Sequence, residues 1–575
     1  MRRFLTLLLT LAVSVLQAQT LDPADYIYPV RGVDGTCAAN FGEMRPGHFH
    51  AGVDIRTGGA EGKELVAVAD GYVSRIAVTP GGYGRAIYVA LRNGTTAVYG
   101  HLQRFRDDIE QHLAAERRAQ RKNSLNLFFG PEAWPVRQGE VIGYSGNSGS
   151  SSGPHLHFEI RDTPTQRLYN PVREGIIRPV DSLPPRIVRI HYIEVDSLPD
   201  GRCVQRRAES YAAVRTGEGR YRLTREEAVG TGRKGYFVAE ITDRRNGVDN
   251  TFGLWRVTAW VDDEPYFEYR MDGFTFDQSR CCDAVSCYPM QLSTRNEAIR
   301  LARIETAPEG FYPTMVDRGL IRTDSGQLRR IRIEAEDDSG NRSQLDFAIR
   351  GREETFRARP DTLARIARPS AATILTVDRS TTARIPAGAL HETIACRPEE
   401  VEAPRTDSGV VVLSPAYRLL PDATPLRRTM EVSIRAEIPP HLQAHATLAR
   451  RTPQGKVLCV GGKYADGMVT AQTYTSDPLF VVADILPPTV AARFKRGADL
   501  SKSSSLSFRA TDNFSGIASY TLLIDGEWTP CDRYPMTGRL VHVFDTPATH
   551  TNHTVQLTVH DGAGNIRHWE GTFYR

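Results

Sequence analysis

The chain has 575 residues, of which 40% are hydrophobic and 24% are charged, so it is long enough for three or four domains of roughly 150 residues each. This ordinary composition excludes wholesale disorder and a fibrous repeat. Lys and Arg number 72 against 68 Asp and Glu, a net charge of +4. This argues against nucleic acid as the main partner, because phosphate binding needs a concentrated basic excess.

The N-terminus has the pattern of a secretory signal peptide. Arg2 and Arg3 precede an apolar run from Phe4 to Leu16, and Ala18 offers a small residue for cleavage. The run is shorter than the roughly 20 apolar residues that cross a bilayer, and no later segment is apolar enough to do so. We therefore expect residues 1–18 to be a signal peptide and the mature protein to be exported, periplasmic or extracellular, without a transmembrane segment.

Cysteine usage fits an exported protein without fixing any pairing. The even number of cysteines permits disulfides, but the sequence chooses neither among their pairings nor an oligomeric state. A cluster of three, Cys281, Cys282 and Cys287, lacks a second CxxC or a paired His motif nearby, which favours disulfide or free thiol over zinc. The eight are Cys37, Cys203, Cys281, Cys282, Cys287, Cys396, Cys459 and Cys531.

Residues 19–180 read as one β-rich unit with short runs separated by glycine. We expect strands at Val66–Val73, Ala86–Leu91 and Thr95–Tyr99, with Asn93 and Gly94 as a two-residue hairpin turn. Together these elements predict an antiparallel meander.

One stretch interrupts this pattern. Residues 104–123 are rich in Ala, Glu, Gln, Arg and Leu and contain neither Pro nor Gly, so they predict a helix. We treat 104–131 as a helical insert. Since it begins three residues after His101, we expect it to border the same cleft and to restrict substrates, with a peripheral ornament as the alternative.

Beyond residue 180 the sequence pattern changes to that of alternating strands, which we divide into three modules. Asp181 to Pro185 and Asp484 to Pro488 are similar junctions that place two prolines ahead of a β-branched run. Asp338 to Asn341 and Asp561 to Asn565 are matching turns before a final strand. We therefore expect tandem β-sandwich (Ig-like) modules at 181–353 and 484–575 and a β-rich module at 354–483, all serving as scaffold or spacer.

Five residues of the first unit have the spacing of a metal site. They are His50 and Asp54 as HxxxD, His101 after Tyr99 and Gly100, and His155 and His157 as HxH. Alternate residues of a strand share a face, so His155 and His157 project to one side together with Glu159. A catalytic zinc site takes three nitrogen or oxygen ligands and keeps a fourth position for water. His50, Asp54 and one histidine of the HxH pair would supply three.

The combination of these motifs with their flanking glycines resembles the lysostaphin-like or LytM-type zinc metallopeptidases, whose signature is HxxxD, then YxH, then GxHxHFE. The order and spacing match from about Gly42 to Ile160. The matching runs are His50–Asp54, Val66–Val73, Gly81–Gly84, Tyr99–Leu102, Gly139–Gly146 and Gly153–Glu159. The resemblance implies a mainly β protein whose N-terminal antiparallel β-sheet, barrel-sandwich-like peptidase domain carries a helical insert.

The resemblance also implies roles for the five residues. His50, Asp54 and His157 would bind Zn²⁺, which lowers the pKa of a bound water and polarises the scissile carbonyl. His155 would act as the base and His101 would support the transition state. His48, two residues before His50, stands outside the ligand position of the motif and reads as an ordinary rim residue.

The implied function is a zinc metalloendopeptidase that hydrolyses peptide cross-links of bacterial peptidoglycan, with peptide stems as its partners. Two alternatives stay open: a metallopeptidase acting on exported proteins or glycine-rich peptides, and a non-catalytic LytM-type activator of other wall hydrolases. All five positions are filled, which disfavours the activator. The insert and the C-terminal modules depart from simple members, and the whole arrangement resembles peptidases of this type from the Bacteroidetes lineage.

Overall fold

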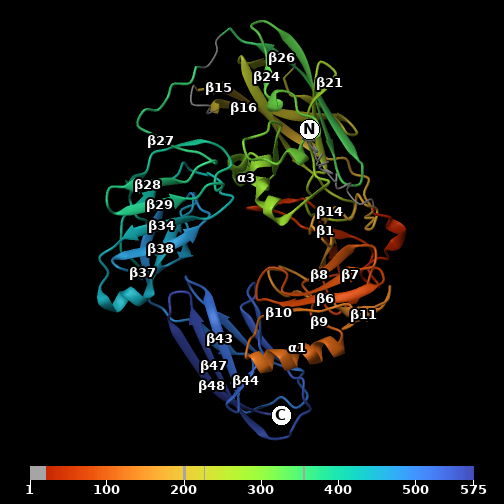
Figure 1. The fold of residues 1–575 in the computed structure, drawn as a ribbon, viewed down its shortest axis with the longest axis vertical. Helices are drawn as coiled ribbons and strands as arrows, with labels where there is room; N and C mark the ends of the chain where they lie inside the picture. Colours follow the sequence, from red (N-terminus) through yellow and green to blue (C-terminus); the bar gives the residue numbers. More distant parts are fainter. Residues whose placement is uncertain (1–20, 199–202, 226, 295, 354–356) are drawn as a thin grey trace, which may run out of the picture.

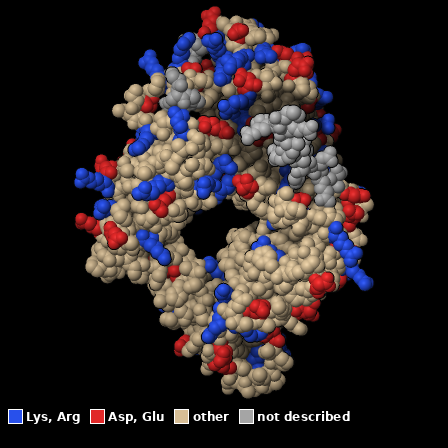
Figure 2. Space-filling model, in the orientation of Figure 1, with Lys and Arg blue, Asp and Glu red and all other residues tan. Residues whose placement is uncertain are grey.

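The computed structural model describes residues 21–198, 203–225, 227–294, 296–353 and 357–575. The expected signal peptide, residues 1–18, lies outside the described residues. The chain is mainly β, and its parts are arranged around a central opening (Figures 1 and 2). None of the described helices combines the length and apolar character needed to cross a membrane. We use first, second, third and fourth unit for residues 21–180, 181–353, 357–483 and 484–575.

The first unit is built on an antiparallel sheet of seven consecutively paired strands, with three further strands attached to it. A small second sheet of β5 (Glu64–Val66), β12 (Val141–Tyr144) and β9 (Arg104–Phe105) packs nearby. In spatial order the main sheet contains β1 (Cys37–Ala39), β4 (Val53–Arg56), β13 (His155–Asp162), β8 (Thr95–Gly100), β7 (Arg85–Leu91), β6 (Gly71–Val78) and β10 (Leu125–Phe128).

The predicted hairpin is confirmed, because β7 and β8 pair around a turn in which Gly94 has a φ of +83°. A single strand over Val66–Val73 is wrong. The chain leaves β5 at Val66 and enters β6 at Gly71, and in between the amide of Val68 donates to the hydroxyl of Tyr99 at 3.0 Å. The buried side chain of Tyr99 therefore satisfies the amide that a neighbouring strand would otherwise bond. Hydrophobic alternation along the sequence cannot reveal such a substitution of partners.

The predicted helix exists but is shorter, spanning α1 (Asp107–Gln120). Three acidic residues in its first turn complement the helix dipole, and the chain leaves it through Arg121 in the left-handed region, with a φ of +50°. The flanks of the predicted segment are strands instead: β9 pairs with β12, and β10 extends the main sheet beside β6. Helix propensity does not register such pairing with distant strands.

The second unit contains a sheet of eleven strands and shares a core with the first. Phe41 and Phe49 pack against Phe274, with ring centroids 5.3 and 5.4 Å apart. In the other direction, Phe252 packs into the core of the first unit. Strand β14 (Leu168–Tyr169) pairs directly with β22 (Gly273–Phe274). The boundary predicted near residue 180 is therefore bridged by continuous apolar packing.

The longest path through the second unit's sheet runs β21 (Glu264–Arg270), β20 (Arg256–Val261), β25 (Leu328–Glu336), β26 (Arg342–Gly351), β17 (Arg220–Leu223), β16 (Cys203–Gly217), β15 (Arg186–Ser197), β19 (Lys234–Thr242) and β23 (Glu297–Arg300). Short helices α2 (Cys282–Val285) and α3 (Tyr288–Thr294) precede β23. All eight cysteines of the chain are unpaired thiols in the structure.

The third and fourth units each contain two main sheets. Those of the third are β28 (Thr373–Val377), β29 (Thr381–Ile385), β34 (Met430–Arg435), β38 (Met468–Thr473) and β37 (Lys463–Ala465), and β31 (Glu399–Val401), β33 (Ala416–Arg418), β39 (Leu479–Asp484), β35 (Ala446–Arg451) and β36 (Val457–Gly461). Those of the fourth are β40 (Thr489–Ala492), β42 (Ser505–Thr511), β46 (Arg539–Val543) and β45 (Asp532–Tyr534), and β41 (Ala498–Asp499), β48 (Ile566–Tyr574), β47 (Asn552–Asp561), β43 (Ile517–Ile524) and β44 (Glu527–Thr529).

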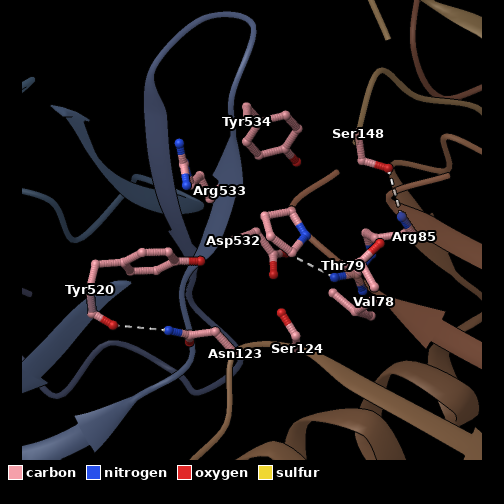
Figure 3. Close-up of a pocket in the computed structure, with 11 residues that line it drawn as sticks. Val78, Thr79, Arg85, Asn123, Ser124, Ser148, Tyr520, Asp532, Arg533 and Tyr534 are labelled. Atoms are coloured by element: carbon pink, nitrogen blue, oxygen red, sulfur yellow. Dashed lines mark hydrogen bonds and ion pairs between the residues drawn. The ribbon is translucent and has the colours of Figure 1, made fainter. Parts of the chain in front are cut away.

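The fourth unit returns to the first and closes the ring beside α1 (Figure 1). Asp532 forms ion pairs with Arg85 at 2.8 Å and with Arg117 of α1 at 2.7 Å. Asn123, just after the helix, donates to the backbone carbonyl of Tyr520 and accepts from the amide of Cys531 at 2.9 Å. Figure 3 shows Arg85 and Asn123 of the first unit and Tyr520 and Asp532 of the fourth unit around a small pocket. The insert is thus a docking surface for the C-terminal end of the chain.

Candidate metal centre

The sheet brings the predicted site residues together. Asp54 on β4 and His157 on β13 are register partners, and His157 also lies opposite Gly100 at the end of β8. His101 follows Gly100 with a φ of +64°, a left-handed conformation that turns the chain out of the sheet. His50 lies in the turn before β4 and is almost completely buried. Three adjacent strands therefore converge on one point.

Three ligand atoms meet there. Nε2 of His50 lies 3.1 Å from Oδ1 of Asp54 and 3.1 Å from Nδ1 of His157, and the latter nitrogen lies 2.9 Å from the same Asp54 oxygen. Ligands about 2.0 Å from a tetrahedral zinc ion would be about 3.3 Å apart. The triangle thus has nearly the size that such an ion requires.

Hydrogen bonds on the outer side of each ring determine which nitrogens face this triangle. Nδ1 of His50 donates to the backbone carbonyl of Asn40 at 2.7 Å, and Nε2 of His157 donates to Glu159 at 2.8 Å. In the neutral rings the two inner nitrogens, Nε2 of His50 and Nδ1 of His157, therefore carry lone pairs. They lie only 3.1 Å apart and next to a carboxylate. Such a donor set fits a cation.

The titration behaviour of His157 points the same way. Burial alone would lower the pKa of His157, but its hydrogen bonds to Asp54 and Glu159 raise it to about 9. The pKa of Asp54 is held well below its usual value, because nearby His50, His155 and His157 outweigh the effect of burial. The surroundings of these atoms thus favour positive charge at their centre.

A second layer of residues holds the ligands. Glu159 is fully buried and also accepts from Nε of Arg161 at 2.6 Å and from the hydroxyl of Tyr83 at 2.5 Å. Burial would raise the pKa of Glu159, but Arg161 and His157 lower it to about 2. Arg45 donates to Oδ2 of Asp54 at 3.1 Å, which leaves Oδ1 for the centre. The hydrogen bond to Glu159 fixes the tautomer of the His157 ring, as carboxylates commonly do for histidines that bind metals.

The other two predicted residues flank the triangle without joining it. His101 and His155 have ring centroids 4.8 Å apart, and Nε2 of His155 lies 3.5 Å from Oδ1 of Asp54. Nδ1 of His101 donates to the carbonyl of Ser148 at 2.9 Å and Nδ1 of His155 to that of Gly153 at 2.8 Å, so Nε2 of each neutral ring is an acceptor. Burial and the neighbouring histidines lower the pKa of His101 to about 3.

The site opens into a cleft of about 600 Å³. Asp54, His101 and His155 form part of its lining, and Asn250 and Thr251 of the second unit form another part. His48 is exposed, with Nδ1 bonded to the carbonyl of Pro46, and it is not one of the groups around the triangle. A peptide in the cleft would therefore contact both units.

Sequence reasoning missed several supporting residues. Tyr83 lies within the glycine-rich run Gly81–Gly84, one of the runs on which the family resemblance rests. Strand alternation places Glu159 on the same face as His157 but does not indicate its role. Asn40 and Arg45 stand in segments with no recognisable pattern. Their contacts depend on how the chain folds back on the site.

Comparison with known proteins gives the first unit a family. The peptidase family M23 profile matches residues 132–171, which contain His155 and His157. The chain carries a peptidase family M23 domain. A Zu5-like domain profile matches residues 375–484 in the third unit.

Two curated relatives match about a fifth of the chain. The DD-carboxypeptidase/endopeptidase Mpg of Neisseria meningitidis serogroup B is 33% identical over 113 residues, 20% of this chain and 20% of that protein. An uncharacterized metalloprotease of Haemophilus influenzae is 37% identical over 120 residues, 20% of this chain and 19% of that protein. The chain thus spans about a fifth of the length of the curated relatives it matches.

Among solved structures, the catalytic domain of lysostaphin from Staphylococcus simulans is 19% identical to this chain. The alignment covers 27% of this chain and 96% of that one, with a TM-score of 0.18.

Proposed function

We propose that the M23 domain is a zinc metalloendopeptidase that hydrolyses peptide cross-links of peptidoglycan. The observation that carries this proposal is the pair of inward-facing ring nitrogens of His50 and His157, 3.1 Å apart beside Oδ1 of Asp54. We assign these three residues as the ligands. A zinc ion bound there would supply Lewis acidity, lowering the pKa of a water and polarising the scissile carbonyl.

The chain's own residues would manage the proton. We propose that Nε2 of His155, an acceptor beside Asp54, takes the proton of the attacking water and passes it to the leaving amine. Nε2 of His101 is also an acceptor while the ring is neutral. It would support the transition state by accepting a hydrogen bond from the attacking water and holding that water in line with the carbonyl.

Cell-wall peptide is the substrate class favoured by the relative named as a DD-carboxypeptidase/endopeptidase. The site itself provides for hydrolysis of a peptide bond and does not distinguish wall stems from glycine-rich or exported proteins. Action on peptidoglycan places the protein outside the cytoplasm, in keeping with the expected signal peptide. We further propose that the second and fourth units are Ig-like sandwiches that act as scaffold.

The test is to incubate the mature, zinc-loaded protein with purified muropeptides and with glycine-rich peptides, and to identify the cleaved bonds by mass spectrometry. Cleavage within wall stems supports the proposal. Cleavage of glycine-rich peptides alone would move the substrate to the alternative class. If neither substrate is cut while zinc is bound at full stoichiometry, the non-catalytic activator becomes the better description.

A further inference from the structure

A second cluster of possible ligands lies at the junction between the M23 domain and the second unit. It comprises Asp181 in the linker, Asp243 directly after β19 and Asp337 directly after β25. One carboxylate oxygen from each lies within 4.8 Å of the others. Two oxygens that each bind one ion at about 2.4 Å can be at most about 4.8 Å apart. The spacing is thus compatible with a single central ion.

Asp243 is the decisive member of this cluster. Its side chain is 1% exposed, and no described residue donates a hydrogen bond to either of its carboxylate oxygens. Oδ2 of Asp181 is likewise buried without a hydrogen-bond donor among the described residues. Leaving a buried carboxylate unpaired is costly, so the position calls for a counter-charge.

The neighbouring arginine does not supply it. Arg245 donates through Nη2 to Oδ1 of Asp338, and its Nε lies 3.8 Å from Oδ2 of Asp181. Asp337 is engaged mainly by its own turn, accepting from the amides of Ser339 and Asn341 at 2.9 Å each. Arg245 therefore pairs with Asp338 and Asp181 and donates no hydrogen bond to either carboxylate oxygen of Asp243.

The fourth unit contains the same arrangement and shows what is different here. Its members are Asp484 at the end of β39, Asp512 directly after β42 and Asp561 at the end of β47. There, Oδ2 of Asp512 accepts from the amides of Phe514 at 3.0 Å and Gly516 at 2.8 Å, within its own loop. The loop after Asp243, all of which the structure describes, instead runs towards the M23 domain, and its amides make no such bonds.

We propose that Asp181, Asp243 and Asp337 bind a divalent cation, and that this cation is calcium. Carboxylate oxygens without nitrogen or sulfur donors are the ligand type of hard cations, and calcium tolerates the irregular geometry of a junction between units better than magnesium. The ion would compensate Asp243 and join the linker to two strand ends of the second unit.

This site would act on the cleft through the loop that begins at Asp243. The amide of Phe252 donates to the carbonyl of Asp243 at 3.1 Å, so the loop is closed at its base. Between these two residues, Asn250 and Thr251 line the cleft and Asn250 accepts from Arg56. A bound cation would hold this wall of the cleft in place.

The experiment measures calcium directly and does not depend on the hydrolytic function. The full mature chain is freed of calcium with EGTA, reloaded with one equivalent of zinc, and titrated with calcium by equilibrium dialysis with elemental analysis. Asp243→Asn is compared with Asp249→Asn, which changes an exposed carboxylate six residues further along the chain. We expect Asp243→Asn to bind one equivalent less than the unsubstituted chain and Asp249→Asn to bind the same amount.

Equal calcium content in Asp243→Asn and the unsubstituted chain, or no calcium bound at millimolar concentration, would overturn the proposal. If Asp243→Asn does not fold, the chain with Asp512→Asn provides the test. That variant alters only the corresponding cluster of the fourth unit, so it must still bind one calcium. Failure to bind calcium in that background would equally reject the site.

Discussion

The backbone carbonyl of Asn40 accepts a hydrogen bond from Nδ1 of His50 over 2.7 Å, and the side chain of Asn40 is in turn held by the second unit. Its amide group exchanges two 2.8 Å hydrogen bonds with the backbone of Gly253 and donates to Asp338 at 3.1 Å. The orientation of a proposed zinc ligand thus depends on a residue more than 200 positions away in the sequence.

Asn40→Ala keeps the carbonyl that His50 bonds to but removes the side-chain hydrogen bonds that hold this carbonyl in place. We therefore expect it to weaken zinc binding by about 10-fold, the lower end of the effect of losing an outer partner of a metal-binding histidine. Competition with a chromogenic chelator measures the affinity. His48→Ala is the matched control, because this exposed ring lies outside the triangle. An Asn40→Ala protein with unchanged zinc affinity would show that the second unit does not position His50.

Glu159→Gln tests the other side of the triangle. The substitution removes the charge that holds Nε2–H of His157 and leaves Arg161 without its carboxylate partner. We expect zinc affinity to fall by about 10- to 100-fold here as well. Glu132→Gln, at an exposed position directly after the insert, is the control and should bind zinc normally.

His155→Ala should separate metal binding from chemistry. Its ring flanks the triangle without belonging to it, so zinc content should stay at one equivalent while hydrolysis falls by at least about 100-fold. Elemental analysis and a muropeptide assay give the two values. Loss of zinc in this variant would instead make His155 a ligand.

Shortening the chain tests the continuity of the apolar core. The spacing of the junctions predicts that a protein ending near Ser182 folds and is active by itself. However, Phe41 and Phe49 are completely buried against Phe274 of the second unit and would become exposed. We expect residues 21–182 to aggregate and residues 21–353 to be soluble and to bind zinc, as judged by gel filtration. A monomeric, zinc-binding 21–182 protein would refute this.

Asp532 should control whether the fourth unit stays docked. Burial raises the pKa of Asp532, but Arg117 and Arg85 lower it below 3.8. Its stabilising contribution is therefore complete above the unfolded value of about 3.9 and is lost as the pH falls through the lower folded value. Asp532→Ala leaves the buried guanidinium of Arg117 without its ionic partner and leaves Arg85 with Glu110 alone, so it should weaken docking of the fourth unit by about 3 kcal/mol.

Small-angle scattering and limited proteolysis can detect the undocked form of Asp532→Ala. Asp545→Ala is the comparison, since its partner Arg118 is 43% exposed and such pairs contribute about 1 kcal/mol or less. Equal stability and equal scattering of the two variants would show that the Asp532 contact does not hold the ring closed.

The sequence predicts the centre of the site better than its surroundings. HxxxD and HxH have fixed spacings, so His50, Asp54 and one histidine of the HxH pair can be grouped from their motifs, and the family resemblance implies that this histidine is His157. The hairpin at Asn93 and Gly94 is equally predictable, because turn chemistry is local. The ends of the helix are not, since β9 and β10 form only by pairing with strands elsewhere.

Contacts over several hundred residues leave no local pattern at all. Asn40 with Asp338, and Arg117 with Asp532, join ordinary polar residues from different units. The repeated junctions and turns predict that the second and fourth units are relatives. They do not reveal that the loop after Asp243 reaches the cleft while the corresponding loop after Asp512 bonds to itself.

The closed arrangement of the four units also lowers the affinity that the contact at Asp532 needs in order to stay formed. The fourth unit is covalently tethered to the M23 domain through the intervening units, so its docking is an intramolecular event with an effective concentration on the order of millimolar. A contact too weak to hold two separate proteins together would still be formed most of the time. The fourth unit can therefore leave the M23 domain and dock again repeatedly while it stays tethered through the second and third units.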